Sequence, residues 1–452
     1  MRDGASRRHG SQSARMLGYA DRRESRRMRG KKLKGMKTVG IIGAGPAGLS
    51  AARMIEETGR ARAVVFERAD RVGGKSYSTP RFGVVHDLGT CYSTLAHGET
   101  NRWMRELGIR QKPIGRQEID GVALPKFVSG GRTFSALGEA ARFAQAWRRT
   151  TRDFETRMHE KDVRSVAAAP VLEWLERHRL PAIARFMLRG LTNMGYGYLD
   201  ATPTVQALRW CTPTLLASGS LSQIKAPAGG WQAFWEKLSQ SLDVRLAQPV
   251  TGVARDGRSV QLTTPTGSHR VDALVIAAPL DELGFEQSAA ERRVAEAIRW
   301  DSYVTTLAGV TGWFHGDEVI AFEDALTPGA PRGALLSARP AGKRPKKRDG
   351  VRLYICGQYG GAHSPDGLVE RLAADLSARG AHLDHVAVQK VWKYNPVYTS
   401  DAIRDGLLEA MAAMQGENRT WYTGAAFSFE SVSNIVTHNR ALAPRIMEQL
   451  AA

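Results

Sequence analysis

The stretch Thr38-Val-Gly-Ile-Ile-Gly-Ala-Gly-Pro-Ala-Gly-Leu-Ser-Ala-Ala52 is an apolar run that ends in three glycines and then becomes helical. This order predicts a β-strand, a tight turn and the start of a helix. Gly43 permits the turn, Gly45 lets the backbone approach a pyrophosphate, and Gly48 lets the helix pack against the strand. The first N–H groups of the helix would face the negative charge. The stretch therefore predicts a dinucleotide site, and a glycine-rich turn without a ligand is the alternative.

A helix and a second strand follow the glycines. Pro46 and Ala47 suit the first turn of a helix that is predicted to end at Glu57, and the apolar run Ala63-Val-Val-Phe ends at Glu67. A carboxylate at the end of the second strand can accept hydrogen bonds from ribose hydroxyls, and it would repel a 2′-phosphate. Because strand, turn, helix, strand and acid occur in this order, we expect NAD or FAD rather than NADP, and the ligand-free turn is disfavoured.

Residues 67–75, Glu-Arg-Ala-Asp-Arg-Val-Gly-Gly-Lys, resemble the second signature of the flavin-containing amine oxidase superfamily, in which an acid is followed by Arg-x-Gly-Gly. The resemblance selects FAD, and it implies that the arginine and the glycine pair run along the FAD diphosphate and flavin. A solvated surface charge is the alternative for that arginine. Members of the family often have Arg after the glycines, where the Lys of this chain keeps the positive charge but loses the bidentate fork. The expected cofactor contacts in this segment are Arg68, Arg71, Gly73, Gly74 and Lys75.

Later segments continue the resemblance in order to about residue 447. They imply a glycine-containing turn against the flavin ring, a strand whose backbone meets the adenine, a return to the FAD edge, and a helix that begins near Ser431. A helix N-terminus aimed at the flavin would stabilise the negative charge of its reduced form. The residues expected to make these contacts are Leu88, Gly89 and Thr90 at the ring, Val250 at the adenine, Ala277 and Pro279 at the edge, and Gly424, Ser431 and Val432 near the C-terminus.

The cysteines bear on the cofactor and on the compartment. Some relatives attach FAD through a cysteine in or near the C-terminal signature, but the last cysteine here is Cys356, so FAD is expected to be bound non-covalently. The chain has three cysteines, Cys91, Cys211 and Cys356, and their spacing is not that of metal ligands, so no metal is expected. An odd number of cysteines argues against a disulfide framework and favours a reducing compartment such as the cytoplasm. Cys91 and His86 are expected to serve packing rather than chemistry.

The resemblance and the changes of pattern along the chain predict an α/β fold. It consists of a glutathione-reductase-like FAD-binding Rossmann domain, assembled from discontinuous segments, and an inserted α+β substrate domain. Residues 101–212 are expected to be mainly helical, because apolar residues there recur at i, i+4. The expected FAD-binding segments are 36–94, 225–282 and 395–452, and the expected substrate segments are 95–224 and 283–394.

Three tyrosines are candidates for a substrate pocket. Tyr196 and Tyr198 lie in Asn193-Met-Gly-Tyr-Gly-Tyr, and they either line an apolar pocket facing the flavin or are core aromatics at a helix bend. Tyr394 belongs to the C-terminal part of the resemblance. Amine oxidases of the family usually place a Lys on the strand at about residues 300–312, where it holds a water near flavin N5, and this chain has none there. This departure argues against oxidation of a simple amine, and the sequence assigns no catalytic acid or base.

Positive charge is concentrated outside the expected fold. The chain of 452 residues has a formal net charge of +19, and residues 1–35 carry 12 Lys and Arg residues against three acidic ones. A disordered extension or an upstream start codon is the favoured interpretation, with a transit peptide and a basic arm for nucleic acid or anionic lipid as alternatives. The basic segment Lys343–Arg348 is expected to be a solvated loop, and steering of an anionic substrate or peripheral membrane contact stays open. No apolar run approaches the ~18 residues of a membrane-spanning helix.

Three short motifs, Gly195-Tyr-Gly-Tyr, Tyr394-Asn-Pro and Gln415-Gly, resemble the branch that contains polyenoic fatty acid isomerase and β-cyclopiazonate dehydrogenase more than monoamine oxidase. The resemblance implies an FAD-dependent oxidoreductase that transfers a hydride from a substrate C–H to flavin N5, with reoxidation by oxygen or another acceptor. One alternative is a double-bond isomerase that acts on an unsaturated fatty acid or a similar apolar acid. The other is a non-enzymatic binder of nucleic acid or of an anionic surface. The expected partner is a small, largely apolar molecule, and nucleic acid is not expected.

Overall fold

The computed structural model describes residues 35–220, 224–313, 316–341 and 350–452. The basic extension expected at residues 1–35, apart from Gly35, and the basic segment expected at 343–348 lie outside these described residues. Within them, no helix is both long enough and apolar enough to cross a membrane.

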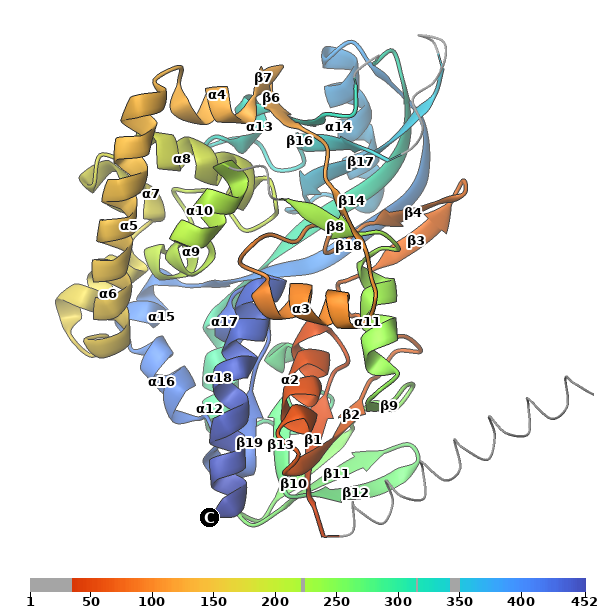
Figure 1. Cartoon of the computed structure of the whole chain (residues 1–452), viewed down its shortest axis with the longest axis vertical. Helices are drawn as coiled ribbons and strands as arrows, with labels where there is room; N and C mark the ends of the chain where they lie inside the picture. Colours follow the sequence, from red (N-terminus) through yellow and green to blue (C-terminus); the bar gives the residue numbers. More distant parts are fainter. Residues whose placement is uncertain (1–34, 221–223, 314–315, 342–349) are drawn as a thin grey trace, which may run out of the picture.

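A five-stranded parallel sheet forms the lower part of the molecule in Figure 1, and segments far apart in the sequence build it. The strand over Lys37–Ile42 lies in the middle of the sheet. It pairs with the strand over Ala273–Ile276 on one side and with the strand over Ala61–Phe66 on the other. The last strand joins at one edge. In spatial order the strands are β19 (Thr420–Tyr422), β13 (Ala273–Ile276), β1 (Lys37–Ile42), β2 (Ala61–Phe66) and β9 (Asp243–Arg245).

Each face of this sheet has its own apolar core. Val39 and Ile41 pack on one face with helices, and Ile42 packs on the other face against a three-stranded antiparallel sheet. Successive residues of a strand point to opposite faces, so a continuous apolar run produces a parallel sheet that is covered on both sides. Gly40 points to the second face, where a Cβ atom would lie 3.0 Å from a methyl of Leu262. The first face is covered by α2 (Pro46–Glu57), α3 (Gly98–Glu106), α11 (Trp231–Ser239) and α18 (Val432–Ala451), and the second by β10 (Gly252–Arg255), β11 (Val260–Thr264) and β12 (Gly267–Val271).

Helix α18 lies beside α2 (Figure 1). The side-chain amide of Asn439 donates hydrogen bonds to the Ala47 carbonyl at 2.8 Å and to Ser50 Oγ at 2.7 Å. The Asn439 side chain is 1% exposed, so these bonds satisfy polar groups that would otherwise be buried without partners. They fix the C-terminal helix against the first turn of α2.

The upper part of the molecule combines a seven-stranded mixed sheet with a group of helices (Figure 1). The long strand β14 pairs antiparallel with both β17 and β18. One core of apolar side chains joins this sheet to the helices. In spatial order the strands are β18 (His382–Tyr398), β14 (Ile298–Thr311), β17 (Arg352–Tyr359), β16 (Leu335–Pro340), β15 (Val319–Ala321), β6 (Gln117–Ile119) and β7 (Val122–Ala123). The helices are α4 (Leu124–Ser129), α5 (Thr133–Thr156), α6 (Lys161–Ala168), α7 (Val171–Arg177), α8 (Pro181–Met187), the π-helix η1 (Leu188–Thr192), α9 (Thr204–Trp210), α10 (Pro213–Ser220) and α13 (Glu323–Leu326).

Two small antiparallel pairs and several short helices complete the described fold. The pairs are β3 (Ser78–Arg81) with β4 (Val84–Asp87), and β5 (Gln111–Pro113) with β8 (Lys225–Pro227). The helices are η2 (Leu280–Glu282), α12 (Ala289–Glu296), α14 (Pro365–Ala378), α15 (Ser400–Arg404), α16 (Leu407–Ala413), η3 (Glu417–Arg419) and α17 (Ala425–Ser428).

The structure confirms the expected α/β class, with a parallel sheet assembled from discontinuous segments. The predicted helix over 46–57 and the helix expected to begin near Ser431 are both found. The expectation that residues 101–212 are mainly helical is confirmed, with one exception, because the three short strands β5, β6 and β7 lie between α3 and α4. Pro and Gly residues interrupt the helical pattern there and favour turns. The exact domain boundaries stay a prediction.

Candidate functional site

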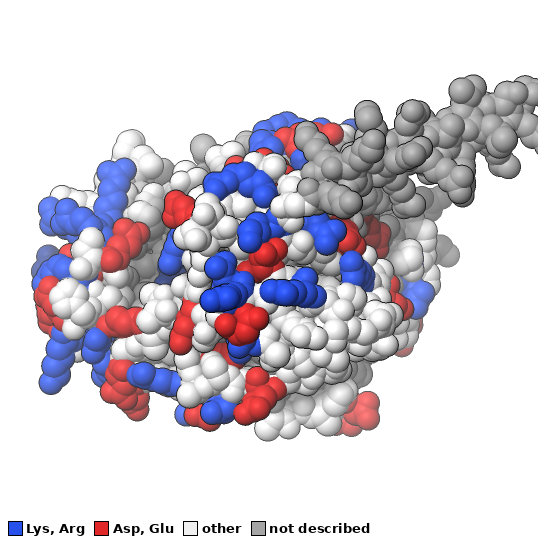
Figure 2. Space-filling view, turned by 90° about the horizontal axis from the view of Figure 1, so that it is seen from below, with Lys and Arg blue, Asp and Glu red and all other residues white. Residues whose placement is uncertain are grey.

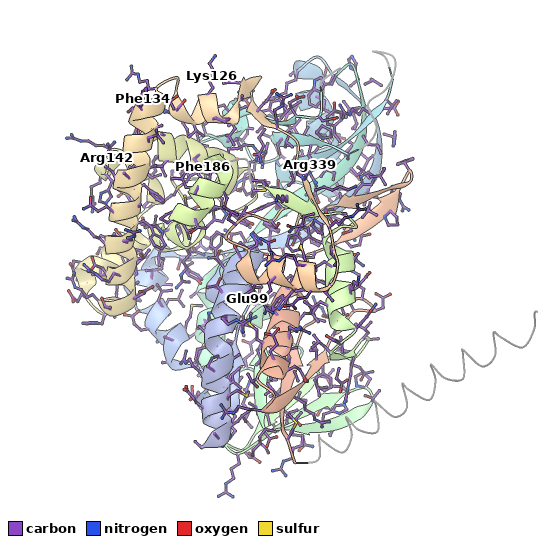
Figure 3. The ribbon with its side chains drawn as sticks, viewed as in Figure 1. Glu99, Lys126, Phe134, Arg142, Phe186 and Arg339 are labelled. Carbon is purple, nitrogen blue, oxygen red and sulfur yellow. The ribbon has the colours of Figure 1, made fainter. Side chains whose placement is uncertain are left out.

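A cavity of about 730 Å³ begins at the carboxyl ends of the parallel strands and reaches the seven-stranded sheet. Ligands of parallel α/β sheets bind in the crevice outside these strand ends. At its far end, Phe186 of α8 lines it from the helical side and Arg339 of β16 from the sheet side (Figure 3). The residues at the strand ends are Ile42, Phe66, Ala277 and Thr423.

The two glycine-rich turns that the sequence predicts for a pyrophosphate face each other. Gly45 and Gly74 both line the cavity, and a Cβ atom on Gly74 would lie 3.1 Å from the Gly45 Cα. Gly73 does not line the cavity, but its N–H donates to a carbonyl of the first turn at 2.8 Å and so ties the two turns together. Pro46 and Ala47 line the same wall. The N-terminus of α2 therefore opens into a cradle that larger side chains would fill.

Glu67 lies where an adenosine ribose is expected. Its Oε2 accepts the Ala44 N–H at 2.6 Å, and its Oε1 accepts the Ala69 N–H at 2.9 Å. Glu67 and Val250 both line the cavity. An ionised carboxylate has about four acceptor positions, so the two backbone bonds orient it and leave positions for two ribose hydroxyls. These remaining acceptor positions fit the hydroxyl donors of the ribose in a dinucleotide.

The expected flavin end is built by one close backbone approach and one helix N-terminus. A Cβ atom on Gly89 would lie 1.7 Å from the Lys75 carbonyl oxygen, so only glycine fits there without a backbone shift. Ser431 Oγ accepts the Asn434 N–H at 3.2 Å and caps α18. Ser431 and Val432 line the cavity. The positive end of the α18 dipole therefore faces the cavity.

Lys75 is held by an acid and a carbonyl. Its Nζ donates to Glu430 Oε2 at 2.7 Å and to the Tyr394 carbonyl at 2.6 Å. Burial raises the pKa of the Glu430 carboxyl, and the Lys75 cation acts in the opposite direction. The charge of Lys75 is thus partnered within the protein, but Lys75 also lines the cavity, and its contact with the cofactor stays a prediction.

Aromatic rings line the part of the cavity beyond the expected flavin. Tyr196 and Tyr394 are stacked with centroids 5.8 Å apart, and Tyr303 lies 5.4 Å from Tyr394. Trp210 lies 6.2 Å from Tyr196 on the other side. All four rings line the cavity, so this region is apolar and shaped by rigid side chains.

Besides Gly73, three predicted residues lie outside the cavity, namely Gly48, Leu88 and Tyr198. Tyr198 packs in the core, where its O–H donates to the Ala325 carbonyl at 3.2 Å, because Gly197, with φ of 106°, turns the chain between Tyr196 and Tyr198. The buried side chain of Leu88 packs in a small separate cluster, and its backbone carbonyl accepts hydrogen bonds from Thr305 and Trp392. Gly48 supports helix packing, since a Cβ there would lie 1.8 Å from a backbone oxygen. The other predicted contacts that do line the cavity are Gly43, Arg68, Arg71, Thr90, Ala277, Pro279 and Gly424.

Side chains with catalytic potential are few. Burial raises the pKa of the Cys91 thiol, which lines the cavity, and His86 lies outside it with Nε2 at 3.1 Å from the Arg81 carbonyl. The packing role expected for both stays a prediction. β14 presents Tyr303 and Thr305 to the cavity where the resembled family usually has a Lys. Among the residues that the structure describes, no group of three or more His, Cys, Asp or Glu side chains is placed to hold a metal.

Sequence reasoning did not identify the helical wall of the site. Phe186, Arg189, Asn193 and Met194 line the cavity from α8, η1 and the turn that follows. The glycines and tyrosines around Tyr196 mark that short segment as a candidate, but the helical pattern before it has no feature that marks which face meets a ligand. Arg189 is 2% exposed and differs in this from the many solvated arginines of the chain.

The sequence matches one protein family model and is similar to several known proteins. The family model described as flavin containing amine oxidoreductase matches residues 46–400. Polyenoic fatty acid isomerase of Ptilota filicina is 23% identical over 263 residues, which cover 50% of this chain and 52% of that protein. Pseudooxynicotine dehydrogenase of a Pseudomonas species is 24% identical over 266 residues, which cover 54% of this chain and 52% of that protein. The matched segments thus span about half the length of these two relatives.

The fold matches that of solved structures over a longer range. The crystal structure of a CLA-producing fatty acid isomerase from P. acnes superposes with a TM-score of 0.77 and 20% identity, over 90% of this chain and 98% of the other. At this identity the match establishes the shared fold.

Proposed function

This chain belongs to the flavin containing amine oxidoreductase family, and on that premise we propose that it binds FAD non-covalently and transfers a hydride from a substrate C–H to flavin N5. Oxygen or another acceptor then takes up the electrons. The observation that carries the proposal is the cavity in which the glycine turns, Glu67 and the α18 N-terminus converge on one side and aromatic rings on the other.

The residues that would hold FAD divide into three groups along the cavity. Glu67 and Val250 would receive the adenosine, and the turns at Gly45 and Gly74 would receive the diphosphate. Gly89 and the N-terminus of α18 would receive the ring, where the helix dipole stabilises negative charge. When bound, FAD supplies the hydride acceptor. The protein orients the substrate and excludes water from the reacting atoms.

Non-covalent attachment is supported by the positions of the cysteines. Cys91 is the only cysteine that lines the cavity among the described residues, and its raised pKa disfavours the reactive thiolate. Precipitation with acid should release yellow FAD into the supernatant, and colour retained in the protein pellet would refute non-covalent binding. The three unpaired thiols also support the proposal of a cytoplasmic location.

A substrate that is small and largely apolar fits the aromatic part of the cavity. Tyr196, Tyr394 and Trp210 offer apolar faces and no carboxylate that would pair with an amine. A second function, double-bond isomerisation of an unsaturated acid, is favoured by one specific observation. β14 places Tyr303 and Thr305 at the cavity rather than a Lys, which departs from the pattern of the amine-oxidising members.

An anaerobic experiment separates the two functions. The purified protein is mixed with amines and with unsaturated acids under strict exclusion of oxygen, while the ~450 nm band expected of a flavoprotein is recorded. Bleaching by one equivalent of substrate, with turnover only after an acceptor is added, supports the oxidoreductase. Many turnovers to an isomer without an acceptor support the isomerase. Colourless protein that cannot be reconstituted with FAD refutes both.

The binder of nucleic acid has little support from the described surface. On the face drawn in Figure 2, Lys and Arg side chains are interspersed with Asp and Glu, whereas backbone binding to nucleic acid uses a basic patch or stripe. Peripheral membrane contact has one supporting feature. Phe134 is 91% exposed at the start of α5, and Lys126 of α4 and Arg142 of α5 project away from the helices in the same upper part of the molecule (Figure 3). Flotation with anionic vesicles, and its loss in Phe134→Ser, would test that contact.

A further inference from the structure

Arg189 is a buried cation that the protein does not neutralise. It lies in the π-helix η1, is 2% exposed and lines the cavity. Its Nε and Nη1 atoms have no hydrogen-bond partner among the described residues. Burial lowers its pKa to about 10, so the guanidinium remains charged at neutral pH. Because an unpaired buried charge is costly, this arrangement predicts a partner that enters the cavity.

The acids that line the cavity are all engaged elsewhere. Glu67 accepts two backbone N–H groups, and Asp87 accepts the Trp231 N–H at 3.0 Å. Glu282 pairs with Arg68 at 2.7 Å, and Glu430 pairs with Lys75 at 2.7 Å. Each has a partner that is not Arg189, so the described part of the protein supplies no counter-ion for it.

The surroundings of Arg189 are rigid and largely apolar. A Cβ atom on the next residue, Gly190, would lie 2.3 Å from the Trp210 ring, so η1 is pressed directly against that ring. Trp210 in turn stacks on Phe186 with centroids 6.1 Å apart. Leu215 lines the same cavity. A ligand that meets Arg189 here therefore needs an anionic group at one end and an apolar body beside it.

A purely structural arginine one turn earlier shows the contrast. Arg185 of α8 donates from Nε to the Val128 carbonyl at 2.9 Å and braces α4. Arg189 has no comparable bond from its Nε. Arg185 is therefore a matched control for Arg189, because the two lie four residues apart and only Arg189 lines the cavity.

We propose that Arg189 is the anchor for the carboxylate of an apolar acid substrate, whose hydrocarbon part lies against the aromatic walls of the cavity. The proposal rests on the function proposed above and names its substrate class. The planar guanidinium suits the two oxygens of a carboxylate. A cationic amine would meet an unneutralised positive charge at the same place, so the site selects acids over amines.

The test uses the FAD-loaded protein and three ligands of equal chain length, namely decanoate, decanol and decylamine. Binding is followed as a perturbation of the visible flavin spectrum. Decanoate is expected to bind about 100-fold more tightly than decanol, and decylamine to bind more weakly than either. In Arg189→Met the advantage of decanoate should fall below about threefold, in Arg189→Lys it should be partly kept, and in Arg185→Met it should be unchanged.

Stability and the resting spectrum provide independent measurements. Removal of an unpaired buried charge should leave the thermal midpoint of Arg189→Met equal to or above that of the parent. Its FAD content and resting spectrum should be unchanged, and a loss of either would show that the cation serves the cofactor instead, which overturns the proposal. Equal binding of acid and alcohol by the parent, or an acid preference that survives in Arg189→Met, also overturns it. Protein that binds decanoate through Arg189 but turns over no substrate would contradict only the proposed function, whereas protein without FAD would remove the basis of both.

Discussion

Glu67 gives the most direct test of where the cofactor lies. Its two carboxylate oxygens accept the N–H groups of Ala44 and Ala69 at 2.6 and 2.9 Å. In Glu67→Gln one oxygen becomes an NH₂ group, which is a donor and must face another donor. One backbone N–H thereby loses a charged acceptor, and the remaining acceptor is neutral.

The expected magnitude follows from these contacts. A hydrogen bond to a charged group contributes about 1.5–3 kcal/mol, so the free energy of unfolding without cofactor should fall by about that amount. If Glu67 also accepts ribose hydroxyls, FAD affinity should fall by about 10- to 100-fold, because each 1.4 kcal/mol is about tenfold.

Glu56→Gln is the matched control. Glu56 Oε1 accepts the Ala63 N–H at 2.9 Å, and Glu56 does not line the cavity. Both variants and the parent are denatured with urea, and FAD binding is measured by quenching of flavin fluorescence. We expect comparable losses of stability but a loss of FAD affinity only in Glu67→Gln. FAD binding within twofold of the parent in Glu67→Gln would refute the placement of the ribose at this carboxylate.

Further predictions concern packing, pH and a buried ion pair. Gly89→Ala should abolish or strongly reduce FAD retention, because its Cβ would lie 1.7 Å from a backbone oxygen. Gly98→Ala is the control and should retain FAD, because no atom lies within 4 Å of its Cβ. The ratio of visible to ultraviolet absorbance measures the FAD retained by each variant. Burial lowers the pKa of His97 from 6.5 to about 3, so between these values the unfolded chain binds a proton that the folded chain does not, and acid favours unfolding. When the pH is lowered from 7 to 5, the free energy of unfolding should therefore fall by about 2 kcal/mol more in the parent than in His97→Asn, as measured by urea titrations. Equal falls in the two proteins would contradict this. Glu291→Ala should lower the free energy of unfolding in urea by about 3–5 kcal/mol, because it leaves Arg255 without its buried partner at 2.7 Å. A loss below about 1 kcal/mol would show that this ion pair is dispensable for stability.

The glycine-rich half of the cavity could be predicted because its signals are local. A glycine at position 45 or 89 is required by backbone geometry within a few residues or at one close approach, and an acid that ends a strand has a fixed direction. The order of strands, turn and helix then leaves few arrangements for these residues. The structure accordingly brings Gly45, Glu67, Gly89 and Ser431 to one cavity.

The aromatic half of the cavity could not be predicted in the same way. Which face of α8 and η1 meets the cavity depends on packing against Trp210 and the distant sheet, and a helical pattern alone does not encode it. The two tyrosines around Gly197 show the difficulty, because one residue with positive φ sends Tyr196 to the cavity and Tyr198 to the core. The Lys75 pairing with Glu430 also depends on a contact across 355 positions, which no local motif contains.

The contact between Asn439 and Ala47 spans 392 positions, and this has a consequence for biosynthesis. At roughly 5–20 residues per second, a ribosome needs about 20–80 s to add the chain between them. During that time the first turn of α2 and its glycine loop are already made, but the helix that completes the pocket is not. Cofactor capture must therefore wait for late translation, and the apolar faces that α18 later covers are exposed to chaperones in the meantime.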